Sequence, residues 1–75
     1  MTPERVIAKV FGVNEGEVGE ATSNQNLQAW DSMGHMTLIM ELESSFGVSL
    51  SMDEALTMTN VSAIKEVLER RGVVW

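Results

Sequence analysis

The chain has 75 residues, a formal net charge of −6 and no cysteine. A chain of this length buries only about 60% of its unfolded surface and can build one small core, which excludes most deep-cleft enzymes. Without cysteine it forms neither disulfides nor thiolate metal sites. No lysine or arginine lies between Val10 and Ile64, where most of the acidic residues are found, so this acidic middle would repel nucleic acid and attract a basic protein.

The first stretch, TPERVIAKVFG, predicts a helix over residues 3–11. Thr2 can cap this helix, Pro3 suits its first position and Gly12 can end it. Its apolar residues recur at helical spacing and form one face: Val6, Ile7, Val10 and Phe11.

The start of the chain lacks the apolar segment of a secretory signal, and no run approaches the roughly 18 apolar residues of a membrane helix. We therefore expect a cytoplasmic protein without a membrane span.

Residues 12–30 predict a long loop, because they contain three of the six glycines and a polar TSNQN cluster without a sustained period. Loops of this length are uncommon in small domains unless they are pinned or functional. Four apolar side chains are available as pins: Val13, Val18, Leu27 and Trp30.

The next helix is predicted to begin at Asp31 or Ser32 and to end near Phe46, with Gly47 as its stop. Its core stripe is predicted to consist of Leu38, Ile39, Leu42 and Phe46. The opposite side, expected to face water, holds Gly34, Thr37, Glu41, Ser44 and Ser45. A third strip on the flank is either peripheral core or a deformable apolar contact surface, and it consists of Met33, Met36 and Met40.

Two further helices complete the prediction. A short helix is expected around residues 53–56 with Ser51 as its cap, and a longer one over residues 60–71 with Thr59 as its cap and Gly72 as its end. The buried face of the longer helix is predicted to hold Val61, Ile64, Val67 and Leu68. The predicted fold is therefore all-α: an irregular four-helix bundle with three main helices, a short third helix and a long first loop, in a single domain over residues 1–75.

Ser32 is the residue whose role the pattern leaves open. A catalytic serine needs a base within hydrogen-bond reach, yet the only histidine, His35, is predicted to point toward the core side, and no nucleophile-elbow turn surrounds Ser32. One histidine and scattered carboxylates offer no metal-ligand spacing. We therefore expect no catalytic residue, no metal site and no enzyme activity, and a structural or exposed His35. Asp31 is a good N-cap, and a serine that follows such a cap needs no further role.

The run DSMGHMTLIMELESSFGV resembles the modification site of acyl carrier proteins, in which Asp-Ser-Leu stands at the start of the second helix. Met33 replaces that leucine here, which is a conservative change in size and polarity. The likeness covers most of the chain, including the helix order and the long first loop. It extends through Leu38, Leu42, Phe46, Gly47, Val48, Leu50, Thr59, Val61 and Ile64.

The resemblance implies that Ser32 carries a covalent 4′-phosphopantetheine arm from coenzyme A, whose thiol holds acyl intermediates as thioesters. It implies that Asp31 contacts the phosphopantetheinyl transferase or its metal-bound coenzyme A. Partner binding is assigned to residues of the same helix: Met33, Met36, Met40, Glu41 and Glu43. The implied partners of this monomeric carrier are the transferase, an acyl-loading ligase or synthase, and acyl-transferring enzymes.

A hydrophobic cargo is expected to part the second and third helices, because a small bundle has no standing pocket. The gap is predicted to be lined by Ile39, Leu42, Leu56 and Met58. The short third helix is the element expected to move.

Some positions depart from the housekeeping pattern of the family. Carriers that serve fatty acid synthesis usually have acids where this chain has Gly34, Thr37 and Ser44. The Trp-Asp-Ser context is more similar to specialised carriers of secondary or surface-polymer metabolism. An aminoacyl cargo stays open, because D-alanine carriers share a similar Asp-Ser-Met-Gly run. Outside the family, the alternative is an unmodified acidic helical module that binds a basic protein, with Asp31 and Ser32 acting only as helix-start residues.

Overall fold

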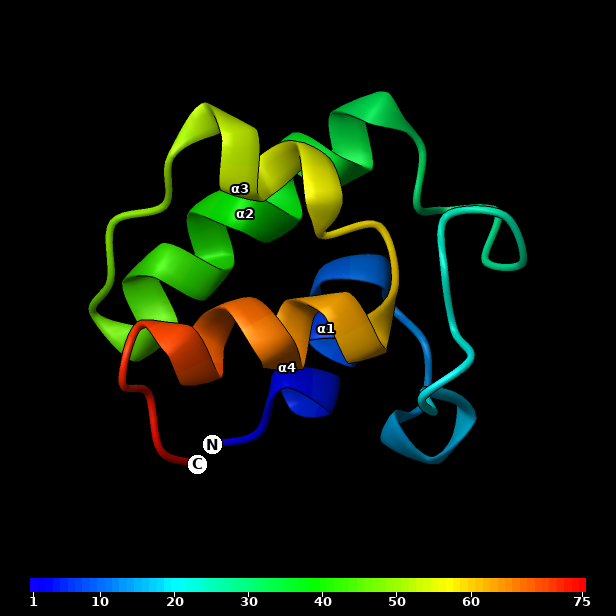
Figure 1. Ribbon diagram of the computed structural model, residues 1–75. Helices are drawn as coiled ribbons and strands as arrows, with labels where there is room; N and C mark the ends of the chain where they lie inside the picture. Colours follow the sequence, from blue (N-terminus) through cyan, green and yellow to red (C-terminus); the bar gives the residue numbers. More distant parts are fainter.

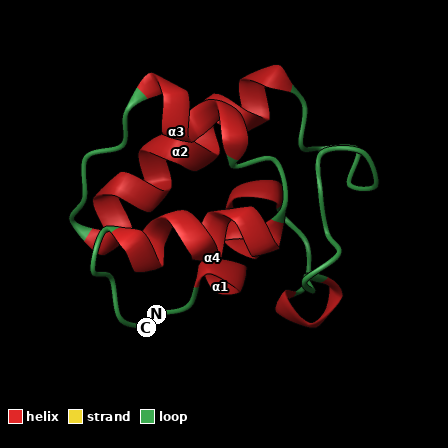
Figure 2. Cartoon of the chain, in the orientation of Figure 1, coloured by secondary structure: helices red, strands yellow, loops and turns green.

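The computed structural model describes all 75 residues and contains only helices and loops. The elements are α1 (Pro3–Phe11), a 3-10 helix η1 (Glu15–Glu17), α2 (Ser32–Phe46), α3 (Met52–Thr57) and α4 (Val61–Arg70). Helix α1 packs against α2 and α4, and the two ends of the chain lie near each other below α4 (Figures 1 and 2). The prediction of an all-α, irregular four-helix bundle with a short third helix and a long first loop is confirmed.

The helix boundaries follow from capping residues that the sequence displays. The Thr2 hydroxyl accepts a hydrogen bond from the Arg5 amide at 3.2 Å, and the Asp31 carboxylate accepts one from the Gly34 amide at 2.8 Å. Gly12 and Gly47 end α1 and α2 in the left-handed region, with φ of 68° and 65°, where glycine is favoured. These starts and stops agree with the predicted ones.

The cap of α4 differs from the prediction. The Asn60 side chain, and not that of Thr59, accepts a hydrogen bond from the Ala63 amide, at 2.7 Å. The cause is a short antiparallel pairing with the long loop, in which the Thr59 carbonyl accepts from the Asn24 amide and the Val61 amide donates to the Thr22 carbonyl, both at 3.0 Å. This pairing keeps Asn60 extended, with φ of −148° and ψ of 166°, so the helix begins one residue later than predicted.

The core consists of 12 buried hydrophobic residues drawn from three helices and from the loops. All four residues predicted for the buried face of α4 are among them, whereas α2 contributes Leu38 and Leu42 fully and Ile39 and Phe46 only partly. The long loop contributes Val18 and Trp30, and Val13 and Leu27 pack against the core, so all four predicted pins reach it. The loop is therefore held by apolar side chains as well as by its pairing with residues 59–61.

Two residues of α2 that were expected to face water do not do so. A Cβ atom on Gly34 would lie 2.5 Å from the Ala29 carbonyl oxygen and 2.9 Å from a ring carbon of Phe11, because the loop and the end of α1 close over the first turn of α2. Glu41 is half-buried, and its Oε2 atom has no hydrogen-bond partner. The other three residues of that side, Thr37, Ser44 and Ser45, are exposed as expected.

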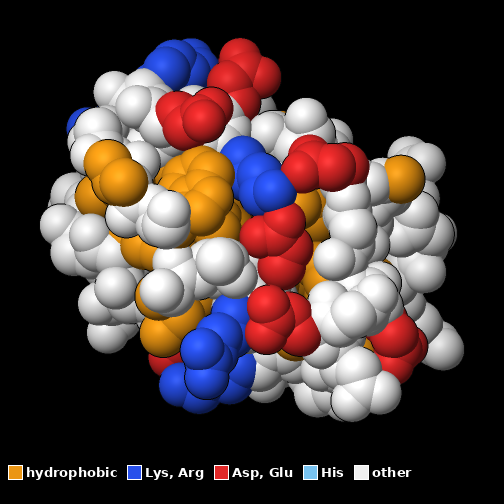
Figure 3. All heavy atoms as spheres, turned by 90° about the horizontal axis from the view of Figure 1, so that it is seen from below, with side chains coloured by type: hydrophobic (Ala, Val, Ile, Leu, Met, Phe, Trp, Pro, Cys, Tyr) orange, Lys and Arg blue, Asp and Glu red, His pale blue; other side chains and the backbone are white.

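The face with α1, α4 and the termini carries charges of both signs. Seen from below the bundle, basic and acidic side chains lie next to one another with hydrophobic side chains between them (Figure 3). Lys65 pairs with Glu4 of α1 at 2.5 Å and with Glu20 of the long loop at 2.7 Å. This cluster ties the long loop to α1 and α4.

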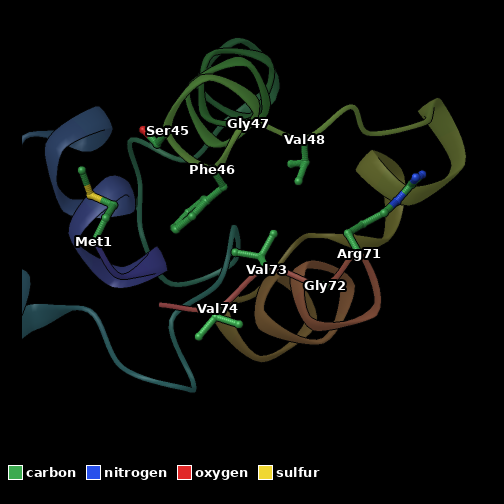
Figure 4. A pocket seen from close by; sticks show the side chains of 9 residues that line it. All are labelled: Met1, Ser45, Phe46, Gly47, Val48, Arg71, Gly72, Val73 and Val74. Carbon is green, nitrogen blue, oxygen red and sulfur yellow. The ribbon is translucent and has the colours of Figure 1, made fainter.

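The C-terminal tail turns back on the end of α4. The Val73 amide donates to the Leu68 carbonyl at 3.0 Å, and Val73 packs against the core, whereas Val74 is 92% exposed. An open hollow of about 490 Å³ lies between this tail, Met1 and the end of α2, with Phe46 and Val73 pointing into it and Arg71 directed away from it (Figure 4). No helix of the bundle is long and apolar enough to cross a membrane.

Candidate functional site

Ser32 occupies the first position of α2, a helix of 15 residues, and is exposed to solvent. Its hydroxyl takes part in no hydrogen bond within the chain, because the cap is supplied by Asp31, whose carboxylate binds the Gly34 amide. The first amides of a helix lack intrahelical partners and carry the positive end of the helix dipole. The site therefore presents a free hydroxyl beside a positive helix terminus.

The residues on either side of the Asp31-Ser32 pair fix its place in the fold. Trp30 is only 1% exposed, and its ring lies 5.4 Å from that of Phe11. Gly34 allows the Ala29 carbonyl to approach the first turn of α2. An anchor before Asp31 and a close backbone contact after Ser32 hold the pair at the surface in one position. The anchor was visible in the sequence as an apolar pin, whereas the contact at Gly34 was not, because periodicity does not show how the loop before the helix and the distant Phe11 fold onto its first turn.

His35 is a structural residue, in agreement with one of the two roles expected for it. Its Nδ1 atom lies 2.9 Å from Nε1 of Trp30, and its Nε2 atom lies 2.8 Å from the Ala55 carbonyl oxygen. The indole N–H can only donate and the carbonyl can only accept, so His35 is neutral, with Nδ1 accepting and Nε2–H donating. Both ring nitrogens are engaged, which leaves none to act as a base for Ser32.

The methionine strip of α2 lies on the surface and is not peripheral core. Met33, Met36 and Met40 are 82%, 63% and 59% exposed. On α3, Met52 and Leu56 are exposed to a similar degree, at 74% and 67%. Together these side chains form an apolar surface that begins beside Ser32 and follows the seam between α2 and α3.

A cavity of about 260 Å³ lies in this seam, and we refer to it as the α2–α3 cavity. Its lining is mostly apolar and comprises His35, Met36, Ile39, Met40, Glu43, Leu50, Ser51, Met52, Ala55 and Leu56. Ile39 and Leu56 line it as predicted. Leu42 and Met58 do not line it, because both are completely buried in the core beneath. A cavity is thus already open between the two helices, contrary to the expectation that only cargo would part them.

The two glutamates assigned to partner recognition have internal contacts. Glu43 is half-buried, and its Oε2 atom accepts a hydrogen bond from the Leu50 amide at 2.8 Å, which fixes the connection between α2 and α3. Glu41 is half-buried on the other side of the helix, with one carboxylate oxygen out of contact with solvent. Their role in recognition remains a prediction, and Glu43 also has a structural role that the sequence did not indicate.

Helix α3 is tied to α4 by an ion pair between Glu54 and Arg71. The Arg71 guanidinium donates to both carboxylate oxygens of Glu54, with the Nε contact at 2.9 Å. These hydrogen bonds, followed by that from the Ser51 amide, lower the pKa of Glu54 from 4.5 to about 2. The carboxylate therefore stays ionised at physiological pH, so the ion pair can form over that whole range.

The residues at the start of α2 fit a covalently attached, phosphate-containing group. The free Ser32 hydroxyl can form a phosphodiester, and the unpaired amides and positive dipole end would favour its negative charge. No basic residue of the chain is needed to activate the serine if an external enzyme supplies the chemistry. No group of three or more His, Cys, Asp or Glu side chains is placed to hold a metal ion.

Comparison with known proteins agrees with this geometry. Residues 4–68 match the family model described as "Phosphopantetheine attachment site". An acyl carrier protein of Rubrobacter xylanophilus is 39% identical over 70 residues, which cover 91% of this chain and 85% of that protein. The matched segment contains Ser32, all four helices up to Leu68 and the long first loop.

Proposed function

The chain belongs to the acyl carrier protein family, whose covalent prosthetic group is 4′-phosphopantetheine, and on this premise we propose that Ser32 is the attachment residue. The observation that carries the proposal is the free, exposed hydroxyl of Ser32 at the first position of α2, with the capping role taken by Asp31. Ser23 and Ser51 are less suited, because their hydroxyls accept backbone hydrogen bonds and are thereby engaged locally.

The chain's own residues present the hydroxyl and do not activate it. When bound, the prosthetic group supplies a thiol that holds the cargo as a thioester. Trp30 and Gly34 fix the start of α2. Asp31 caps the first turn through one carboxylate oxygen and is exposed as a residue, so a transferase or its metal-bound coenzyme A can meet it. The protein acts as a substrate and carrier in this proposal, and the partner enzymes provide catalysis.

Partner enzymes are proposed to dock on the apolar surface beside Ser32. Met33, Met36 and Met40 are exposed and flexible, so they can adapt to several partners in turn: a phosphopantetheinyl transferase, a loading ligase or synthase, and acyl-transferring enzymes. Glu41 and Glu43 add negative charge that would steer basic partner surfaces to this helix. We propose that residues 1–75 act as one monomeric carrier domain in the cytoplasm.

The α2–α3 cavity supports an acyl cargo. Its lining is mostly apolar, which favours a hydrocarbon chain over a small charged aminoacyl group, although Glu43 at its wall could meet an amine. Hydrophobic cargo of modest length would be partly sheltered there. The departures at Gly34, Thr37 and Ser44 favour a specialised carrier of secondary metabolism over one of general fatty acid synthesis.

The test of the attachment site is the intact mass of the protein after incubation with coenzyme A and a broad-specificity phosphopantetheinyl transferase. We expect the wild type to gain one phosphopantetheine and Ser32→Ala to gain none. Ser62→Ala is the matched control, because Ser62 is also exposed in the first turn of a helix, and it should be modified like the wild type. Circular dichroism should show Ser32→Ala to be folded, since Asp31 keeps the cap.

Modification of Ser32→Ala would move the attachment site elsewhere in the chain. If several transferases failed to modify the wild type, an unmodified acidic interaction module would become the better account, with Ser32 only a helix-start residue.

A further inference from the structure

Helix α3 is held in the bundle without burying any residue of its own. It has 6 residues, none of them buried, and its two largest apolar side chains, Met52 and Leu56, are mostly exposed. Apolar burial comes only from the residues that flank the helix, Leu50, which packs against the core, and Met58, which is fully buried. Between these two ends, hydrogen bonds and one ion pair hold α3 over the α2–α3 cavity.

Three polar contacts perform this task at different points. Glu43 accepts from the Leu50 amide before the helix begins, at 2.8 Å. Arg71 binds Glu54 on the side that faces α4. His35 is the contact that joins α3 to α2 itself, because its Nε2–H donates to the Ala55 carbonyl at 2.8 Å. His35 and Ala55 both line the α2–α3 cavity, so this hydrogen bond connects its two walls.

The His35 ring is itself held by the residue that precedes the Asp31-Ser32 pair. Nδ1 of His35 accepts from the indole N–H of Trp30 at 2.9 Å, and Trp30 is fixed in the core beside Phe11. The bond from Trp30 selects the tautomer in which Nε2 carries the proton, and that proton is the one given to Ala55. A continuous chain of hydrogen bonds thus runs from the anchor of the long loop, through α2, to α3.

We propose that His35 is a positioning residue that latches α3 over the α2–α3 cavity, with Trp30 setting its tautomer and orientation. The latch sets how often α3 separates from α2 and exposes the interior of the cavity. The contacts are internal to the unmodified chain and do not depend on Ser32. The meaning of the latch for a sheltered acyl cargo rests on the proposed function.

The test uses two measurements on the unmodified protein. One is the exchange rate of the amide hydrogens of residues 52–57. The other is the labelling rate of a thiol placed inside the cavity by Ile39→Cys, which would be the only cysteine in the chain. Both rates report opening of α3 in the folded protein, and neither needs a cofactor or a partner enzyme.

His35→Asn and His35→Gln separate the two halves of the latch. The asparagine oxygen can accept from Trp30 but its short side chain cannot reach Ala55, so both rates should rise about 5-fold, as expected for the loss of one hydrogen bond. The longer glutamine can place its amide N–H near the former Nε2 position, so His35→Gln should restore most of the protection. Trp30→Phe removes the indole donor and also shrinks a buried side chain, so its free energy of unfolding is measured alongside. Both rates should rise more than that loss of stability accounts for, although Trp30 does not line the cavity.

A matched control excludes a merely structural effect. Val67→Ala truncates the core within α4 at a residue that does not line the α2–α3 cavity, and should lower global stability without changing the two opening rates under conditions in which the protein stays folded. Unchanged rates in His35→Asn, or rates that follow global stability alike in all variants, would overturn the latch. Because Ser32 is intact in every variant, the mass test of the attachment site can fail or succeed independently of this result.

Discussion

Helices α3 and α4 follow each other in the chain, and they are held in the bundle by different forces. Helix α4 buries Val61, Ile64, Val67 and Leu68 in the core, whereas α3 buries no residue and is tied through Ala55 and Glu54. Burial of apolar side chains is worth several times more than exposed polar contacts. The bundle therefore has two parts. One consists of α1, α2 and α4, which bury the core, and we refer to it as the firm half. The other is α3, a loosely held helix beside the candidate attachment site.

This difference suits a carrier. The firm half keeps Ser32, the proposed attachment residue, at the start of α2. The loosely held α3 lets the α2–α3 cavity open and close at low cost in free energy, because few apolar contacts have to be broken.

The largest effect is expected from truncating the core of the firm half. Leu68→Ala, in α4, removes a fully buried side chain and should lower the free energy of unfolding by about 2 to 5 kcal/mol. Leu56→Ala, in α3, removes the same atoms from a side chain that is 67% exposed and should change it by less than about 0.5 kcal/mol. Urea denaturation followed by circular dichroism measures both. Equal effects at the two positions would remove the contrast.

A smaller effect is expected at Gly34, where the firm half closes over the start of α2. Gly34→Ala puts a methyl group against the Ala29 carbonyl and the Phe11 ring, and should destabilise the fold by about 1 to 3 kcal/mol through overpacking. Gly19→Ala is the matched control, because nothing lies within 4 Å of its Cβ position and its φ is not in the left-handed region. A stable Gly34→Ala protein would mean that the loop yields easily and that Ser32 is less rigidly placed than we infer.

The smallest effect concerns the ion pair that ties α3 to α4. The pKa of Glu54 is lowered from 4.5 to about 2 by its hydrogen bonds to Arg71 and Ser51. A carboxyl group with a lowered pKa in the folded state contributes stability that is complete above its unfolded value, and this contribution is lost as the pH falls from 4.5 toward 2. Because Arg71 is exposed and Glu54 is only partly buried, solvent screens the pair and the change should be modest.

Glu54→Gln should remove this part of the pH dependence. Thermal melting of the wild type and of Glu54→Gln, at pH 6 and at pH 3, measures it. The melting temperatures of the two proteins should converge at the lower pH. Parallel losses in both proteins would show that other carboxylates carry the acid sensitivity.

Much of the fold could be predicted because its signals are local. Thr2, Pro3 and Gly12 bound α1, and Asp31 and Gly47 bound α2, through hydrogen bonds and backbone angles within a few residues of each helix end. The position of Ser32 at the start of α2 follows from the same local chemistry. The face of α4 was readable because helical periodicity alone decides which of its residues share a side.

The errors of prediction share a physical cause, which is a partner distant in sequence. The cap of α4 moved from Thr59 to Asn60 because residues 22–24 of the long loop pair with residues 59–61. Gly34 was expected to face water, and its close contact comes from the loop and α1. Periodicity describes which side of a helix a residue occupies, but it contains no information on which segment will cover that side.

Four features could be inferred from the amino-acid sequence alone: the helices, their main boundaries, the exposed serine after a capping aspartate and the likeness to acyl carrier proteins. Those features depend on neighbours along the chain. The tertiary structure decided that His35 joins Trp30 to Ala55, that Glu43 holds the Leu50 amide, and that α3 is tied by polar contacts over a cavity. Such contacts depend on the direction of individual donors and acceptors in space, and only the packed chain sets those directions.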